Sequence, residues 1–265
     1  MNILIFGING NLGRYLSEFL QKKHVICSYE SKDKILFRLP NTKKVVQSIL
    51  DFKPDIIINL VAYADVDACE KDIQIAYTSN VLSVTSIVES INSDLIKVKP
   101  HLIHISTDHV YNGNGFNKEN EIKLLNNYAF TKFLGEEMIT NCSNTILRTN
   151  YIGKSRVSKN KSLGDWIVNS LSNNKEIVGF SDIKFNPIHV YTLCKIIDLV
   201  CKKKINGTYN VGAKDSVSKY EYAVFLAKEL NLNNNLIKKG LSKTDVTKRS
   251  CDMRRSVKKF EQDFD

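Results

Sequence analysis

Apolar runs of strand length alternate with amphipathic segments of helix length through the first half of this chain. Two parallel strands need a long crossover between them, usually a helix, so this alternation is typical of βαβ units in a parallel sheet. The sequence therefore predicts an α/β fold with a doubly wound parallel sheet. The predicted strands are Ile3–Phe6, Val25–Ser28, Ile35–Phe37, Ile56–Leu60, Leu102–Ser106 and Thr145–Leu147.

The regular alternation stops after Arg148, which divides the chain into two unequal parts. Before that point, Gln74–Ile91 has helical spacing and enough length to cross a sheet. We predict one domain over residues 1–150, with later returns to it near 185–212, and a small lobe over 151–184 and 213–265. The second part is expected to contain a loop, two strands and three helices: Tyr151–Lys161, Ile177–Gly179, Thr208–Val211, Leu163–Leu171, Leu193–Cys201 and Tyr220–Leu230.

Composition excludes several classes of protein. The 265 residues carry a formal net charge of +10, but the lysines are scattered. The one dense cluster, from Lys248 to Lys259, is interpreted as a solvated face, with a site for substrate phosphates as the next alternative and a nucleic-acid site as the last. The six cysteines form no CxxC pair and have no histidine at zinc spacing, so no metal site is predicted. With no signal-like start and no apolar run long enough to span a bilayer, we expect a cytoplasmic protein without a membrane partner.

Three glycines follow the first predicted strand: Gly7, Gly10 and Gly13. In a strand–turn–helix context such glycines permit a tight turn, close approach to a pyrophosphate and close packing of helix on strand. Phosphate at that helix N-terminus would meet free N–H groups and the positive end of the helix dipole. The alternative is a glycine-rich turn that only connects the two elements. The context favours dinucleotide binding, although the spacing is GxxGxxG rather than GxGxxG.

The residues after the second predicted strand bear on which dinucleotide is bound. Glu30 suits a ribose 2′-hydroxyl, and Lys32, two residues later, suits a 2′-phosphate. The choice between NAD and NADP therefore stays open.

Tyr128 and Lys132 are four residues apart at the start of a predicted helix, so both side chains lie on one face. Tyrosine has an unperturbed pKa of about 10, and a nearby lysine cation could bring it toward neutrality for general acid chemistry. An ordinary half-exposed helix face would have the same spacing.

A run of Ser106, Thr107 and Asp108 ends the predicted strand Leu102–Ser106. Parallel α/β sheets bind ligands at this edge, where a hydroxyl could bind a substrate oxygen beside the tyrosine. The simpler alternative is a turn that ends the strand. His104, inside the apolar strand, is interpreted as a core histidine with satisfied hydrogen bonds rather than a proton relay.

Several motifs occur in the order expected for one family: the glycine motif, Asn59-Leu60-Val61-Ala62-Tyr63-Ala64-Asp65-Val66-Asp67, Ser106-Thr107-Asp108-His109-Val110-Tyr111-Asn112-Gly113, Tyr128 to Lys132 with Gly135-Glu136, and Leu147-Arg148-Thr149. Together they resemble the extended short-chain dehydrogenase/reductases, and most closely the dTDP-4-dehydrorhamnose reductase (RmlD-like) family. The match covers most of the first 150 residues. Departures, such as Tyr151 where the family carries tryptophan, leave the identity of the sugar open. The nucleotide base and the stereochemistry of reduction are not determined by the sequence either.

The resemblance implies a Rossmann oxidoreductase that binds NADPH or NADH and delivers hydride to the 4-keto group of a nucleotide-activated deoxysugar, in surface-polysaccharide biosynthesis. It implies that Tyr128 is the proton donor and also contacts the cofactor, that Lys132 lowers the tyrosine pKa and holds the nicotinamide ribose, and that Thr107 orients the keto oxygen. The small lobe would bind substrate, and a homodimer is the expected assembly. The remaining implied sites are Gly7, Gly10, Asn11, Leu12, Gly13, Glu30, Ala62, Tyr63 and Ser106 for the cofactor, and Thr107, Asp108 and Tyr151 for the sugar.

Two alternatives keep the fold and change the chemistry. A nucleotide-sugar epimerase of the same superfamily would hold its cofactor without net oxidation. A non-catalytic NADP-binding regulatory subunit would be expected to have lost Tyr128 or Lys132, and both residues are present.

Overall fold

A six-stranded parallel sheet forms the centre of the computed structural model, which describes residues 1–29, 41–157, 162–242 and 247–264. The strand order is β10-β5-β4-β3-β1-β2. The strands span Asn2–Phe6 (β1), Val25–Tyr29 (β2), Ile56–Asn59 (β3), His101–Thr107 (β4), Asn144–Thr149 (β5) and Gly207–Val211 (β10). The predicted parallel α/β sheet is confirmed, while the predicted strand Ile35–Phe37 lies outside the described residues.

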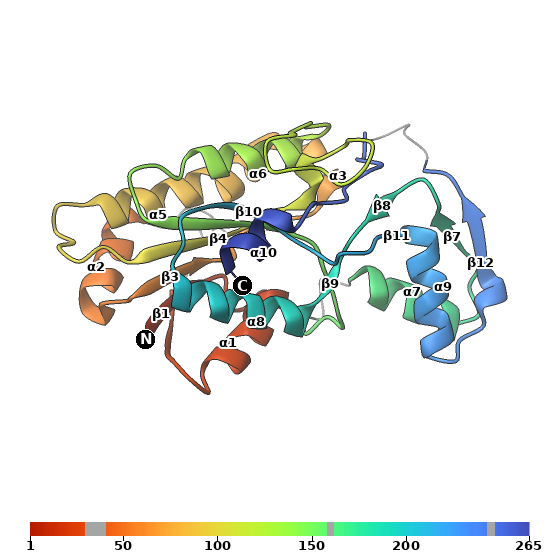
Figure 1. Cartoon of the computed structure of the whole chain (residues 1–265), viewed down its shortest axis with the longest axis horizontal. Coiled ribbons are helices and arrows are strands. Elements are labelled where there is room, and N and C mark those ends of the chain that lie inside the picture. The colour runs from red at the N-terminus through yellow and green to blue at the C-terminus, as the bar shows by residue number, and fades with distance from the viewer. Residues whose placement is uncertain (30–40, 158–161, 243–246, 265) are drawn as a thin grey trace.

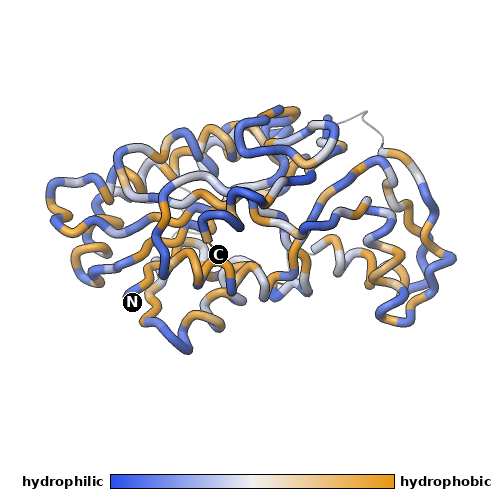
Figure 2. The backbone as a smooth tube through the Cα atoms, viewed as in Figure 1, coloured by the Kyte–Doolittle hydropathy of each residue, from blue (hydrophilic) through white to orange (hydrophobic). Residues whose placement is uncertain are grey.

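Helices cover both faces of this sheet (Figure 1). One face packs against α1 (Asn11–Leu20), α8 (Val190–Lys203) and α10 (Lys258–Phe264), and the other packs against α2 (Thr42–Phe52) and α5 (Ser83–Asn92). The inner strands β1, β3, β4 and β5 are almost completely buried because of this cover, whereas the edge strand β2 is partly exposed, and Figure 2 shows hydrophobic residues running along the sheet. The expected division into domains stays a prediction, although α10 packs on the large sheet and not in the smaller lobe.

The helix predicted over Gln74–Ile91 changes its hydrogen-bonding pattern in the middle. It consists of α4 (Ile73–Tyr77), a π-helical turn η2 (Thr78–Leu82) and α5. The turn carries Asn80, whose fully buried amide bonds the backbone of another segment rather than solvent. A π-turn adds one residue to the helix, which sequence periodicity does not reveal.

The smaller lobe has its own hydrophobic core, on the right of Figure 1. Helices α7 (Leu163–Ser172) and α9 (Lys219–Glu229) each begin with a capping box, in which a serine side chain and a downstream carboxylate cap each other's backbone N–H groups. They pack near the strand pairs β7 (Ile177–Phe180) with β12 (Ile237–Gly240) and β8 (Lys184–Phe185) with β11 (Val217–Ser218). The segment expected to be a loop from Tyr151 instead starts with a short strand, β6 (Tyr151–Ile152), paired with β9 (Ile188–His189). The other described elements are α3 (Val66–Lys71), η3 (Asp108–Val110), α6 (Asn127–Glu137) and η4 (Asn234–Leu236).

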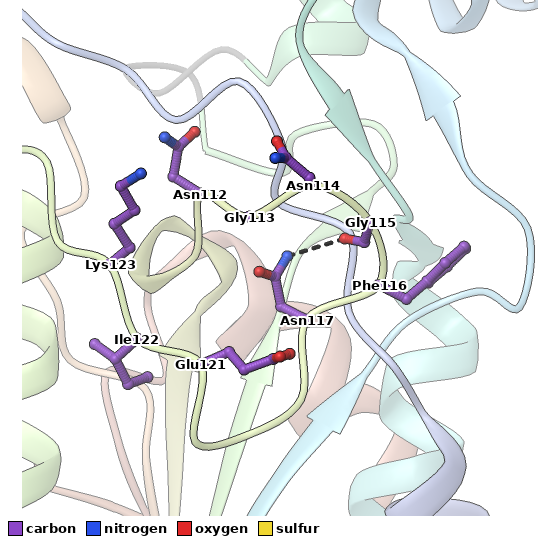
Figure 3. A pocket seen from close by; sticks show the side chains of 9 residues that line it. All are labelled: Asn112, Gly113, Asn114, Gly115, Phe116, Asn117, Glu121, Ile122 and Lys123. Carbon is purple, nitrogen blue, oxygen red and sulfur yellow. Dashed lines mark hydrogen bonds between the residues drawn. The ribbon is translucent and has the colours of Figure 1, made fainter.

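The C-terminal segment 251–256 ties the two parts together. Lys184 donates its backbone N–H to Cys251, and Asn117 donates its own to Arg254 at 2.8 Å. The loop from Asn112 to Lys123, shown in Figure 3, therefore packs against this segment and encloses a polar hollow of about 410 Å³. Among the described residues, no helix is both long and apolar enough to cross a membrane.

His101, at the start of β4, makes stability depend on pH. Its ring nitrogens lie 2.6 Å from the Ser143 hydroxyl and 2.7 Å from the Thr145 hydroxyl, and burial together with Lys204 lowers its pKa to about 4. Between pH 6.5 and 4 the unfolded chain therefore binds more protons than the folded one, and stability falls as the pH falls through this window. We expect the stability advantage of wild type over His101→Gln in urea unfolding to narrow from pH 7 to pH 4.5. A constant difference would contradict this account.

Candidate active site

A cleft of about 490 Å³ opens at the carboxyl ends of β1, β3, β4 and β5 and reaches the start of α7. In this sheet the chain passes from β1 outward to β2 and then returns to β3 on the other side of β1, and ligands bind at such a reversal point. The cleft gathers twelve of the residues that the sequence assigned to a site. They are Gly7, Gly10, Asn11, Leu12, Gly13, Ala62, Ser106, Thr107, Asp108, Tyr128, Lys132 and Tyr151. Tyr63 is not among the lining residues, and Glu30 lies outside the described residues.

The glycine turn fits a pyrophosphate group. Gly7 has a φ of +85°, a conformation that other residues rarely adopt, and a Cβ at Gly13 would lie 2.4 Å from the carbonyl oxygens of Gly7 and Ile8. Helix α1 starts after Gly10, which offers no capping side chain, so its first N–H groups are left for other partners. An anion in the cleft beside them would also meet the positive end of the helix dipole.

We expect Gly13→Ala to destabilise the protein by about 1–3 kcal/mol, because the added methyl meets backbone atoms that have no room to rotate away. Gly10→Ala is the matched control, since its Cβ would meet only the Gly7 carbonyl oxygen, at 3.2 Å. Urea unfolding without ligand checks both variants. Equal stabilities would contradict the role assigned to Gly13.

Tyr151 lines the cleft and also contacts the start of α1, and its expected role in binding the sugar stays a prediction. The Asn11 amide and the Leu12 N–H both donate hydrogen bonds to its phenol oxygen, which partly offsets the rise in the phenol pKa caused by burial. Asn11 also accepts a hydrogen bond from the Arg156 N–H at 2.8 Å. Segment 151–156 therefore packs against α1 at the edge of the cleft, after strand β6 has paired with β9.

Asn80 holds the segment that contains Ala62 and Tyr63. Its amide oxygen accepts from the Tyr63 N–H at 2.8 Å, and its amide nitrogen donates to the Tyr63 carbonyl at 3.2 Å and to the Thr131 hydroxyl at 3.0 Å. The backbone after β3 is thereby fixed to helix α6. Sequence reasoning missed Asn80, since its partners are 17 and 51 residues away.

Tyr128 and Thr107 meet in the cleft. Tyr128 lies in the first turn of α6, where the Asn126 side chain caps the helix by accepting from Ala129 N–H at 2.9 Å. Burial raises the pKa of the Tyr128 phenol, and a hydrogen bond with the Thr107 side chain opposes that rise. The His109 ring packs edge-on against the Tyr128 ring, with centroids 5.3 Å apart.

The Lys132 side chain is almost completely buried. Its ammonium nitrogen lies 2.9 Å from the Ile105 carbonyl oxygen and 3.3 Å from His104 Nε2. Burial lowers the Lys132 pKa to about 8, opposed by the negative charge of Glu136. The expected effect of Lys132 on the tyrosine pKa stays a prediction. The interpretation of His104 as a buried, hydrogen-bonded histidine agrees with its geometry, but its contact with Lys132 was not foreseen.

Ser106 lines the cleft while its hydroxyl bonds a buried carboxylate, and its expected role in cofactor binding stays a prediction. Its hydroxyl donates to Glu136, which also accepts from the Arg148 guanidinium at 2.6 Å. Arg148 donates further to the Tyr111 hydroxyl at 2.8 Å. This network is buried and lies directly behind the cleft.

Asp108 lines the cleft and is held by two residues that the sequence did not assign. One carboxylate oxygen accepts from the Asn150 amide at 2.9 Å and pairs with Arg255 at 2.6 Å. The other oxygen is buried without a hydrogen-bond partner among the described residues.

The full burial of Arg255 corrects one prediction. Its side chain is 0% exposed, whereas the basic cluster from Lys248 to Lys259 was expected to be a solvated face. Arg249 in the same cluster does remain exposed and pairs with Asp67 at 2.6 Å. Spacing in a basic run does not reveal which member packs inward, because the partner Asp108 is remote in sequence.

Comparison with known proteins agrees with this geometry. A family model described as the RmlD substrate binding domain matches residues 1–260. The chain is 28% identical to a dTDP-4-dehydrorhamnose reductase of Aggregatibacter actinomycetemcomitans (86% of this chain, 78% of the relative). It is 27% identical to the spore coat polysaccharide biosynthesis protein SpsK of Bacillus subtilis (89% and 81%). A solved structure of dTDP-4-dehydrorhamnose reductase from Bacillus anthracis in complex with NADP has the same fold, with a TM-score of 0.86 at 24% identity (98% and 91%).

Proposed function

Since the chain belongs to the RmlD substrate binding domain family, we propose that it reduces the 4-keto group of a nucleotide-activated deoxysugar with NADPH or NADH. The reaction would serve surface-polysaccharide biosynthesis. The names of the relatives support this, since they are dTDP-4-dehydrorhamnose reductases and a spore coat polysaccharide biosynthesis protein. The observation that carries the proposal is the meeting of Thr107, Tyr128 and Lys132 in one cleft with the glycine turn.

The proposed mechanism divides the cleft into two halves. The glycine turn and the start of α1 would bind the pyrophosphate of the cofactor, which supplies hydride to the sugar C4 carbon when bound. Tyr128 would donate its phenolic proton to the carbonyl oxygen, so that the ketone becomes an alcohol and the tyrosine becomes a phenolate. Thr107, hydrogen-bonded to the tyrosine, would orient that oxygen, and Lys132 would stabilise the phenolate and bind the nicotinamide ribose.

Asp108 would bind the sugar through its carboxylate oxygen without a partner. A buried acceptor lacking a donor is costly, so a substrate hydroxyl at this point would gain a charge-assisted hydrogen bond. Arg255 and Asn150 would keep the carboxylate pointed into the cleft.

The deciding experiment supplies NADPH or NADH with dTDP- and GDP-linked 4-keto-6-deoxy sugars and follows absorbance at 340 nm. We expect stoichiometric oxidation of one cofactor with at least one sugar. Conversion of a sugar without net oxidation would indicate the epimerase instead. If no cofactor is oxidised and no sugar is converted, but the cofactor still binds, the result would indicate a non-catalytic subunit. Because Glu30 lies outside the described residues, both cofactors are tested.

Two finer expectations belong to the same proposal. We propose that the enzyme works in the cytoplasm, where nucleotide-activated sugars and reduced nicotinamide cofactors are made, and that it forms a homodimer. Sedimentation equilibrium of the purified chain tests the second, and a mass of one 30.2 kDa subunit would contradict it.

A further inference from the structure

His104 lies in β4 directly beneath Lys132, where the proposed mechanism does not use it. The ring is completely buried and each nitrogen faces one partner. Nδ1 lies 3.1 Å from the Asn59 amide nitrogen, and Nε2 lies 3.3 Å from the Lys132 side-chain nitrogen. Since a neutral histidine carries one proton on either nitrogen, the position of that proton decides what Lys132 meets.

The position of the His104 proton follows from a neighbouring group that can only donate a hydrogen bond. The Val61 backbone N–H lies 3.0 Å from Asn59 Oδ1, and a backbone N–H can only donate. The Asn59 amide is therefore oriented with its oxygen toward Val61 and its nitrogen toward His104. An amide nitrogen also only donates, so His104 Nδ1 must accept. In the neutral ring the proton is then on Nε2.

The ring is neutral for two reasons. A doubly protonated ring would direct Nδ1–H at the N–H groups of the Asn59 amide, donor against donor. Burial, and to a lesser extent the neighbouring Lys132, also lower the His104 pKa well below its usual value. Nε2–H therefore points at Lys132.

An ammonium has three donors and no acceptor, whereas a neutral amine has a lone pair. Lys132 already donates to the Ile105 carbonyl at 2.9 Å. The two contacts together suit a neutral amine that donates one N–H to Ile105 and accepts from His104. Resting on the function proposed above, we propose that His104 is a positioning residue that favours the neutral amine of Lys132 over its ammonium form while Tyr128 is a phenol, with Asn59 fixing the proton that does so. The phenolate formed on Tyr128 would oppose this preference, because its negative charge favours the ammonium that the proposed mechanism uses.

Charged and titratable groups from the neighbouring elements also act on Lys132. On its own helix, Glu136 favours the ammonium, but this carboxylate is paired with Arg148 of β5. Tyr128 of α6 and Asp108 of η3 share the cleft, and the Asp108 charge is balanced by Arg255. The Glu136 and Asp108 charges are each compensated by an arginine. The direct contact with His104 is therefore the specific local influence on the protonation of Lys132.

The first test reads the tautomer in the wild-type protein without any substrate. In ¹⁵N-histidine NMR, the His104 signals are assigned by their loss in His104→Phe. We expect Nε2 in the protonated range and Nδ1 in the unprotonated range, unchanged from pH 6 to pH 9. A protonated Nδ1 would overturn the proposal, whether or not the chain reduces sugars.

The second test reverses the tautomer with an isosteric change. In Asn59→Asp the carboxylate can accept both from the Val61 N–H and from His104 Nδ1–H, so Nε2 would become an acceptor for the ammonium. We expect the Lys132 titration, followed by its ¹³Cε shift, to move upward by about one pH unit or more, the size of one hydrogen bond to a charged group. The His104→Phe variant, which removes the donor, should also move it upward.

A double variant separates the tautomer from the charge of the new carboxylate. In the His104→Phe background, adding Asn59→Asp changes only the charge, so the extra upward shift should be smaller than the shift that Asn59→Asp produces alone. Equal shifts in both backgrounds, or an unchanged titration in the single variants, would overturn the proposal. If the reductase function holds, the pH profile of kcat should move with the Lys132 titration in each variant. If the NMR titrations shift as expected but the chain reduces no sugar, only the proposed reductase function is rejected.

Discussion

Tyr128→Phe is expected to lower kcat for sugar reduction by about 10²- to 10⁴-fold, the range that a positioned general acid contributes. The reason is that phenylalanine fills the same space in α6 but has no proton to donate to the developing alkoxide. Binding of the cofactor should change little, because the glycine turn that would hold the pyrophosphate is on a different element. Steady-state kinetics with the best sugar of the panel, together with cofactor titration by fluorescence, measures both effects.

Tyr222→Phe is the matched control for this experiment. Tyr222 is 6% exposed and Tyr128 is 8% exposed, but Tyr222 belongs to the hydrophobic core of the smaller lobe. We expect this control to keep kcat within about twofold of wild type. A Tyr128→Phe enzyme that retains more than a tenth of wild-type kcat would show that another group supplies the proton.

Arg148→Met is expected to produce the largest loss of stability, about 3–5 kcal/mol, which is the usual penalty for breaking a buried ion pair from one side. Arg148 and Glu136 have side chains that are 5% and 2% exposed, and the guanidinium also holds the Tyr111 hydroxyl. Its removal leaves a buried carboxylate without its cation. The free energy of unfolding in urea, measured by circular dichroism, tests this.

Two further variants sharpen the interpretation. Lys238→Met breaks an ion pair with Glu176 in which both side chains are more than half exposed, and it should leave the free energy of unfolding unchanged within error. The double variant Arg148→Met, Glu136→Leu removes both charges and should recover part of the loss. A double variant less stable than Arg148→Met alone would mean that the polar network, rather than the uncompensated charge, dominates.

The parts of this fold that the sequence predicted are those encoded in local patterns. Strands with apolar runs, such as Ile56–Asn59, and the turn at Gly7 were recognisable because burial and backbone conformation restrict the residue types there. The cleft residues Thr107 and Tyr128 were recognisable through their place at a strand end and a helix start.

What escaped prediction depends on partners that are distant along the chain. His104 differs from an ordinary core histidine only through Asn59 and Lys132, which are 45 and 28 residues away. Arg255 differs from its exposed neighbours only through its pairing with Asp108. The contact of Tyr151 with the start of α1 was not foreseen, because it follows from the pairing of two-residue strands that carry no recognisable pattern.

The tie between segment 251–256 and the loop at Asn117 has a consequence for folding. These contacts join residues up to 140 positions apart, so they can close only after the intervening chain has been brought together. The Asp108–Arg255 pair lies at the same seam. The sheet can therefore assemble first, and catalytic competence should emerge late, as a slow final phase of refolding after the far-ultraviolet signal has recovered.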